Sequence, residues 1–209
     1  MDTETPDNDR SDLLKKVYEI GHGMDLSERT LDKAVDLVES YRDQFKVYEQ
    51  YLPAAAVHVA SRLNDEPRTQ KMIVAYLEAQ DNLFTADKDE DIGRYVREDV
   101  KKLRKQEGID LSLVRSTEYL DYIVSQLEHV AASDDLVGTA EKYCEAVEEY
   151  DGLSRSKVAI AGSCLKAAVE ETGGDHSITT AQLARVTGMN PKTFENNLKH
   201  FRENDILPQ

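Results

Sequence analysis

The chain has 209 residues and a formal net charge of −15, and 40% of its residues are hydrophobic. This length allows one large domain or two smaller ones. Residues with high helix propensity dominate, and the chain has only 10 Gly and 5 Pro, so we expect an all-α protein. We find no apolar run of about 18 residues and no signal peptide in the acidic N-terminus. We therefore expect a soluble, cytoplasmic protein that does not contact a membrane.

The cysteine and histidine residues give no sign of a catalytic or metal site. The two cysteines, Cys144 and Cys164, form no Cys-x-x-Cys motif and have no histidine at ligand spacing, which argues against a zinc site and a disulfide framework. The five histidines are scattered, and no nucleophile motif or phosphate-binding glycine loop is present. We therefore expect no enzyme activity, no catalytic or metal-binding residues and no cofactor.

The first half of the chain predicts a disordered acidic tail over residues 1–9 and then five helices. Apolar spacing, caps and prolines define them. The five are a helix that ends at Gly21–Gly23, one capped by Ser27, a small-residue helix opened by Pro53, one from Thr69 to about Ala79, and one from about Asp91 to Gln106.

The second half repeats this order. It predicts helices around 119–127 and 136–147, a small-residue helix at 156–169, and two short helices capped by Thr179 and Asn190. Placing Ala55 over Ala159 aligns the small-residue helices at a period of about 104 residues. The predicted organisation is two five-helix units, over residues 10–110 and 111–209.

The last two predicted helices form a helix-turn-helix over Thr179–Asn204. Thr179 and Gln182 have capping-box spacing, and Gly188 suits the end of the first helix. The second helix then begins with Asn190 as its N-cap and Pro191 as its first residue. The apolar residues Phe194, Leu198 and Phe201 then share the inward face.

The other positions of the second helix point outward in this prediction. They are Lys192, Thr193, Glu195, Asn196 and Lys199, with Asn197 and His200 less clearly placed. An α-helix fits the major groove of DNA, where Asn can bind adenine and Lys can bind guanine or phosphate. Many helix-turn-helices only pack or bind protein, so both DNA contact and protein contact are open on this ground.

Charge is distributed unevenly along the chain. Residues 179–209 carry four Lys and Arg residues, Arg185 among them, against three Asp and Glu residues. Residues 94–105 carry six basic residues against Glu98 and Asp99. An acidic body with two locally basic helices fits life in molar salt, where the Debye length is only about 3 Å. An acidic surface is also common without any such habitat.

A calcium loop is a weak alternative around residue 90. Asp87, Asp89, Asp91 and Glu98 follow calcium-ligand spacing, but Ile92 occupies the position that needs Gly. A solvated helix N-terminus fits this segment better.

The segment Thr179–Asn196 resembles the end of the second cyclin-like repeat of archaeal transcription factor B and its eukaryotic counterpart. The matching residues are Thr179, Gln182, Ala184, Val186, Gly188, Thr193 and Asn196. In the first half, residues 54–63, 66–70 and 91–95 resemble the corresponding parts of the first repeat. The resemblance covers about residues 12–205 and implies two tandem cyclin folds.

This resemblance implies binding to promoter DNA and to the TATA-binding protein. By position, Lys192, Thr193, Asn196, Asn197 and Lys199 would face DNA, with Arg185 adding charge on the preceding helix. Arg94, Arg97 and Lys101 would be weaker phosphate contacts. RNA polymerase and other transcription proteins are further partners of such a factor.

Two departures from the family limit this expectation. No cysteine precedes Cys144, so we expect no N-terminal zinc ribbon, and the resemblance does not imply that polymerase is recruited in the ordinary way. The extra residues around Gln80–Glu90 predict a remodelled first repeat. The competing hypothesis is a cyclin-like protein-interaction module without DNA binding, which the net acidity favours.

Overall fold

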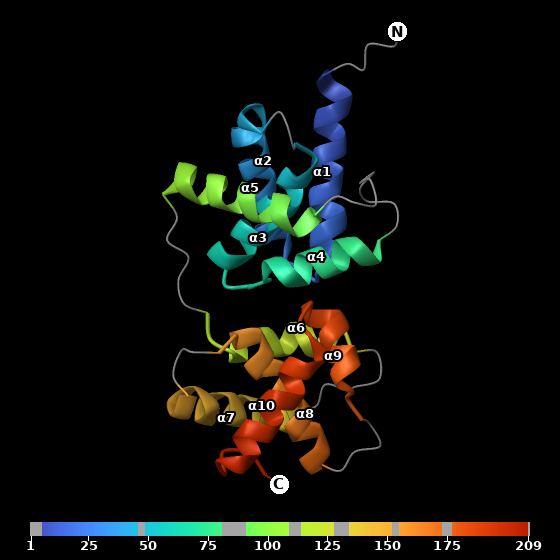
Figure 1. The fold of residues 1–209 in the computed structure, drawn as a ribbon. Helices are drawn as coiled ribbons and strands as arrows, with labels where there is room; N and C mark the ends of the chain where they lie inside the picture. The colour runs from blue at the N-terminus through green and yellow to red at the C-terminus, as the bar shows by residue number, and fades with distance from the viewer. Residues whose placement is uncertain are drawn as a thin grey trace. The chain divides into compact units, whose positions relative to one another are not determined.

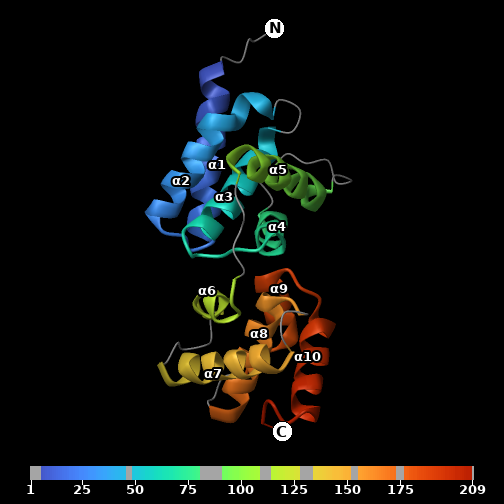
Figure 2. The same ribbon diagram turned by 90° about the vertical axis from the view of Figure 1, so that its left-hand side faces the viewer.

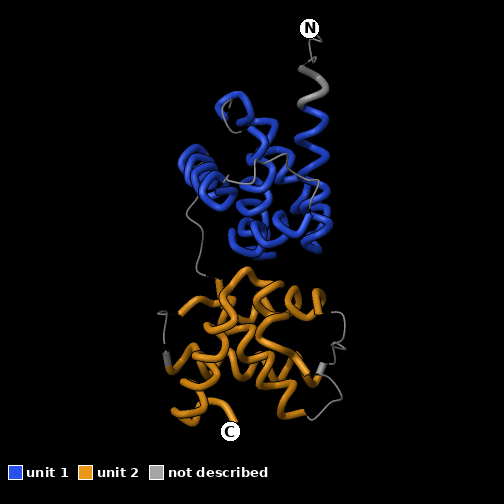
Figure 3. The backbone as a smooth tube through the Cα atoms, turned by 45° about the vertical axis from the view of Figure 1, so that its right-hand side comes forward, with its two compact units in different colours: residues 1–112 blue, residues 113–209 orange. Residues whose placement is uncertain are grey.

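The structure, a computed structural model, describes residues 6–45, 49–80, 91–108, 114–127, 134–151, 155–172 and 177–208. All regular secondary structure in these ranges is helical (Figure 1), which confirms the all-α prediction. The chain divides into two compact units, residues 1–112 and 113–209 (Figure 3).

Unit 1 contains five α-helices in its described part. They are α1 (Pro6–Gly23), α2 (Glu28–Tyr41), α3 (Leu52–Leu63), α4 (Gln70–Ala79) and α5 (Ile92–Glu107). Two short 3₁₀ helices, η1 (Arg42–Gln44) and η2 (Glu49–Tyr51), lie between α2 and α3. Helix α1 begins within the expected disordered tail, because Pro6 is compatible with a first helical turn. Residues 1–5 of that tail lie outside the described residues.

Helix α3 is the centre of unit 1. Every residue from Leu52 to Ser61 is buried, and α3 contacts α1, α2, α4 and α5. Its run of alanines lets these neighbours approach closely, as the sequence predicted. The caps at Ser27 and Thr69 are also confirmed, since their hydroxyls accept the amides of Thr30 and Met72.

Unit 2 contains α6 (Leu120–Ser125), α7 (Asp134–Asp151), α8 (Lys157–Thr172), α9 (Thr180–Thr187) and α10 (Pro191–Glu203). The 3₁₀ helix η3 (Thr117–Tyr119) precedes α6. Helix α6 is shorter than predicted, because its first turn is the 3₁₀ helix η3 and residues 126 and 127 are not helical.

Helix α8 is the centre of unit 2 and contacts α6, α7, α9 and α10. A Cβ atom on Gly162 would lie 2.7 Å from the Phe194 ring, so this glycine lets α10 pack closely on α8. Cys144 and Cys164 are buried free cysteines. Burial and the neighbouring Cys144 raise the pKa of the Cys164 thiol.

The described residues contain neither a cluster of metal ligands nor a helix that could span a membrane. No group of three or more His, Cys, Asp or Glu side chains there is placed to hold a metal ion. No helix in the described ranges is long and apolar enough to cross a membrane.

Candidate nucleic-acid interface

Helices α9 and α10 are defined by the local signals that the sequence predicted. The Thr179 hydroxyl accepts the Gln182 amide at 3.2 Å, and Gln182 Oε1 accepts the Thr179 amide at 2.8 Å. Gly188 ends α9 in the left-handed region at φ 65°. The Asn190 side chain then accepts the Lys192 amide at 2.9 Å. The two helices are therefore joined by the short segment Gly188–Asn190 and lie side by side (Figures 1 and 2).

The inner face of α10 is apolar. Phe194, Leu198 and Phe201 are buried, and α10 contacts α8 and α9. Leu183 and Val186 of α9 are buried as well. This packing fixes which side of α10 faces outward.

The outer face of α10 carries most of the predicted DNA contacts. Lys192, Asn196 and Lys199 are exposed, and Thr193 is half-buried. The three exposed residues follow spacings of four and three, so they form one stripe along the helix. Arg185 is exposed in the last turn of α9.

Both lysines of this stripe have acidic neighbours on the same helix. Lys192 Nζ lies 2.7 Å from Glu195 Oε2, and Lys199 Nζ lies 3.7 Å from Glu203 Oε1. Ion pairs at such exposed positions contribute only about 0–1 kcal/mol. A phosphate or base could therefore replace either carboxylate at small cost.

Asn197 corrects the sequence prediction. It is only 3% exposed, because it lies on the same side of α10 as Phe194 and Phe201. Its Oδ1 accepts a hydrogen bond of 2.9 Å from Arg155 Nη1. Asn197 thus positions the segment before α8 and cannot face DNA in this structure.

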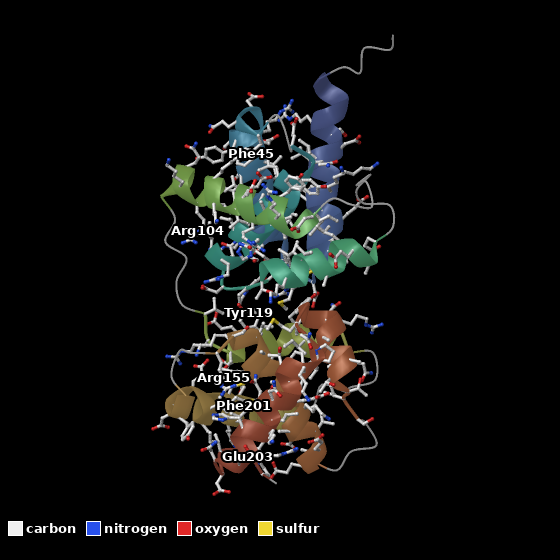
Figure 4. The ribbon with its side chains drawn as sticks, viewed as in Figure 1. Phe45, Arg104, Tyr119, Arg155, Phe201 and Glu203 are labelled. Atoms are coloured by element: carbon white, nitrogen blue, oxygen red, sulfur yellow. The ribbon has the colours of Figure 1, made fainter. Side chains whose placement is uncertain are left out.

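Arg155 is a neighbour of α10 that the sequence did not reveal. Its guanidinium lies 5.5 Å from the centre of the Phe201 ring, and Figure 4 shows the two labelled side chains close together on unit 2. His200, one of the less clearly placed residues, is half-buried with its ring 6.4 Å from Tyr150 and 5.8 Å from Phe201. Local spacing could not show the contacts of Arg155 with Phe201 or of Tyr150 with His200, because each joins distant parts of the chain.

The weaker phosphate candidates lie on the outside of α5. Arg94, Arg97 and Lys101 are exposed, and Arg94 Nε lies 3.2 Å from Glu98 Oε1. They belong to unit 1, whereas the α10 stripe belongs to unit 2. The structure therefore does not bring the two groups together in one compact unit.

The start of α5 bears on two further expectations. Asp91 caps the helix, with Oδ1 accepting the Arg94 amide at 2.9 Å, as expected of a solvated helix N-terminus. Of the other candidate calcium ligands, Glu98 lies 3.2 Å from Arg94 Nε, and Asp87 and Asp89 lie outside the described residues. So do residues 81–90, where the remodelled turn was expected.

Comparisons with known proteins find similarity among solved structures. No protein-family model matches the chain, and no curated protein matches it. Among solved structures, the chain is similar to a viral cyclin from Herpesvirus saimiri. The two share 18% identity over 96% of this chain and 86% of the viral chain, with a TM-score of 0.39.

Proposed function

We propose that the chain is a DNA-binding protein related to transcription factor B, which acts in transcription initiation or its regulation together with the TATA-binding protein. In this proposal it has two tandem cyclin-like repeats of five helices, and α9 and α10 form a helix-turn-helix. It is not an enzyme and acts in the cytoplasm. Its main support is the stripe of Lys192, Asn196 and Lys199, exposed opposite the buried face of α10.

The chemistry of this stripe suits the major groove. The Asn196 amide has the donor and acceptor needed for a bidentate contact with adenine. Lys192 and Lys199 flank it and are suited to phosphate or guanine. The capped start of α10 and its apolar inner face hold these side chains on a rigid element, as base reading requires.

The two repeats are supported by matching helix contacts. In unit 1, α3 contacts the other four α-helices, and in unit 2, α8 contacts the other four. Both helices consist largely of small residues. The next helix in each unit is capped by a threonine, Thr69 or Thr179.

The net charge of −15 shapes how such a protein would bind. Phosphate contacts give affinity by releasing counterions, and this gain shrinks as the salt concentration rises. On an acidic protein, base contacts and a partner protein must therefore supply much of the affinity. We expect weak DNA binding by the chain alone and stronger binding with the TATA-binding protein.

Footprinting in high potassium chloride, with and without the TATA-binding protein, tests the proposal. Lys192→Ala should weaken protection on all sequences, because a phosphate contact is not base-specific. Asn196→Ala should weaken it by about 1–3 kcal/mol at one base pair. Lys142→Ala is the matched control, because Lys142 is an exposed lysine on α7 of the same unit.

Absence of protection in every condition would contradict DNA binding. It would favour the competing function, a helical protein-interaction module, which the net acidity also suits. Protection that is equal in wild type, Lys192→Ala and Asn196→Ala would instead contradict the assignment of these residues.

A further inference from the structure

Unit 1 contains a pocket that the proposed DNA-binding function does not use. It has a volume of about 400 Å³ and lies among α3, α4 and α5. The lining residues are His58, Arg62, Thr69, Gln70, Lys71, Val100 and Arg104. Figure 4 labels Arg104, which projects from α5.

The charge of this pocket is opposite to that of the chain. Arg62, Lys71 and Arg104 line it, and no carboxylate is among the described lining residues. The whole chain has 41 Asp and Glu residues against 26 Lys and Arg. Three cations around one cavity therefore produce a local positive field on an acidic protein, and this field favours an anionic ligand.

His58 supplies a buried polar group at this pocket. The side chain is only 5% exposed, and Nδ1 lies 2.6 Å from the Arg68 carbonyl oxygen. Burial is the main cause that lowers the pKa of His58 to about 4; the hydrogen bond to Arg68 opposes this shift, and the nearby charges of Arg62 and Arg104 add to it. The ring is therefore neutral at pH 7, with Nδ1 donating to Arg68, which leaves Nε2 as an acceptor.

The start of α4 adds hydrogen-bond donors. Thr69 Oγ1 accepts the Met72 amide at 3.1 Å, so its hydroxyl proton can be donated elsewhere. The first amides of an α-helix have no acceptor within the helix, and Gln70 and Lys71 occupy these positions. On the opposite wall, Arg104 Nε is buried and has no hydrogen-bond partner among the described residues.

We propose that this pocket binds the phosphate group of a small phosphorylated metabolite. A phosphate monoester has several acceptor oxygens and a charge near −2, which match two guanidinium groups, a lysine and helix amides. A volume of about 400 Å³ is within the range of small-molecule sites. It leaves room for a sugar or nucleoside beside the phosphate, and His58 Nε2 can accept a hydroxyl of that part.

Isothermal titration calorimetry of the full chain tests this site. Ribose 5-phosphate and adenosine monophosphate represent sugar and nucleoside sources of the same phosphate chemistry, with inorganic phosphate and uncharged ribose for comparison. We expect the two monoesters to bind, phosphate to bind more weakly, and ribose not to bind. The monoester that binds more tightly indicates whether the phosphate of the ligand is attached to a sugar or to a nucleoside.

Variants then locate the binding. Arg104→Gln should weaken binding at least about tenfold, which is the effect of losing about 1.4 kcal/mol. Lys71→Ala should weaken it several-fold and is exposed, so it should fold normally even if Arg104→Gln does not. Lys105→Ala is the matched control, because Lys105 is exposed on α5 but does not line the pocket. It should leave binding unchanged.

Three results would overturn the inference. They are binding weaker than about 10 mM for every phosphate compound, equal loss of binding in Lys71→Ala and Lys105→Ala, and displacement of the monoesters by short duplex DNA. The last result would assign the pocket to a nucleic-acid backbone. None of these measurements depends on Lys192 or Asn196, so the pocket and the proposed DNA function can fail separately.

Discussion

The two units use similar central helices but differ in what they bury. In unit 1 the buried polar side chains include His58, Arg68 and Asp99. In the described part of unit 2 they are Ser116, Ser163, Thr187 and Asn197. The described part of unit 1 therefore buries ionisable side chains among its helices, whereas unit 2 packs apolar groups closely around Gly162 and Phe194.

This difference matches the two proposed sites. Unit 1 directs charged side chains into a pocket, and unit 2 presents them on the outside of α10. A helix that presents a stripe of exposed side chains needs a buried apolar face on its opposite side to hold it in place. A pocket for an anion needs buried polar groups, and these cost stability unless they are hydrogen-bonded.

Arg68 should give the largest single effect on stability. Its Nε donates to the Met24 carbonyl at 2.9 Å and its Nη2 to the Asp25 carbonyl at 3.0 Å. These bonds tie the turn after α1 to the segment before α4. Arg68→Ala should lower the stability of unit 1 by about 3–5 kcal/mol, because the buried Met24 carbonyl and the part-buried Asp25 carbonyl lose a charged donor.

Hydrogen exchange read by mass spectrometry would measure this loss in each unit of the full chain. Unit 2 should be unaffected. Arg29→Ala is the control, because Arg29 is exposed and should change stability by less than about 0.5 kcal/mol. Equal effects of the two substitutions would contradict the role of Arg68.

His58 should give the next largest effect, which is a dependence of the stability of unit 1 on pH. Its folded pKa of about 4 is below the ordinary histidine value of 6.5, so the unfolded chain takes up a proton at a higher pH than the folded chain does. The stabilisation is complete above pH 6.5 and is lost as the pH falls to 4. This loss amounts to about 3 kcal/mol.

The comparison with His58→Asn isolates this effect in unit 1. Asp99 acts in the opposite direction, because burial raises its pKa to about 6 despite the charge of Lys102. Its contribution is present below pH 4 and is lost as the pH rises to 6. Because Asp99 is present in both proteins, its contribution cancels when the stability of His58→Asn is subtracted from that of the wild type at each pH. A difference that does not change between pH 7 and pH 4 would contradict the buried neutral histidine.

Gly162 tests the packing of unit 2. Gly162→Ala should destabilise unit 2 by about 2 kcal/mol, because the new methyl group would displace the buried Phe194 ring. Gly138→Ala on α7 is the matched control, since a Cβ there meets no atom within 4 Å. It should stabilise unit 2 by about 0.5–1 kcal/mol through helix propensity. Hydrogen exchange in unit 2, measured at increasing temperature, should show a loss of protection for Gly162→Ala and a gain for Gly138→Ala.

The smallest effect is expected at the two threonine caps. Thr179→Ala and Thr69→Ala should each cost about 1 kcal/mol, because each removes the acceptor of a first-turn amide. Exchange protection should fall in α9 for the first and in α4 for the second. Thr193→Ala, within α10, should change neither helix. Similar losses at both caps would support the likeness of the units.

Local signals account for most of what the sequence predicted correctly. Caps at Ser27, Thr69, Thr179 and Asn190 depend on residues within three positions, and the inner face of α10 depends on helical spacing. Asn197 was misplaced although it lies three residues after Phe194 and four before Phe201, spacings that put it on their side of the helix; only its partner Arg155, 42 residues away, could not be foreseen. The pocket was missed because folding alone joins His58 and Arg62 to Arg104.

Selection of duplex DNA from a random-sequence pool, in high potassium chloride and with the TATA-binding protein present, tests most directly whether α10 reads bases. The wild-type chain should enrich a short motif, and Asn196→Ala should lose preference at one position of it. Lys142→Ala should enrich the wild-type motif unchanged. Sequences no different from those enriched by the TATA-binding protein alone would contradict the proposed function.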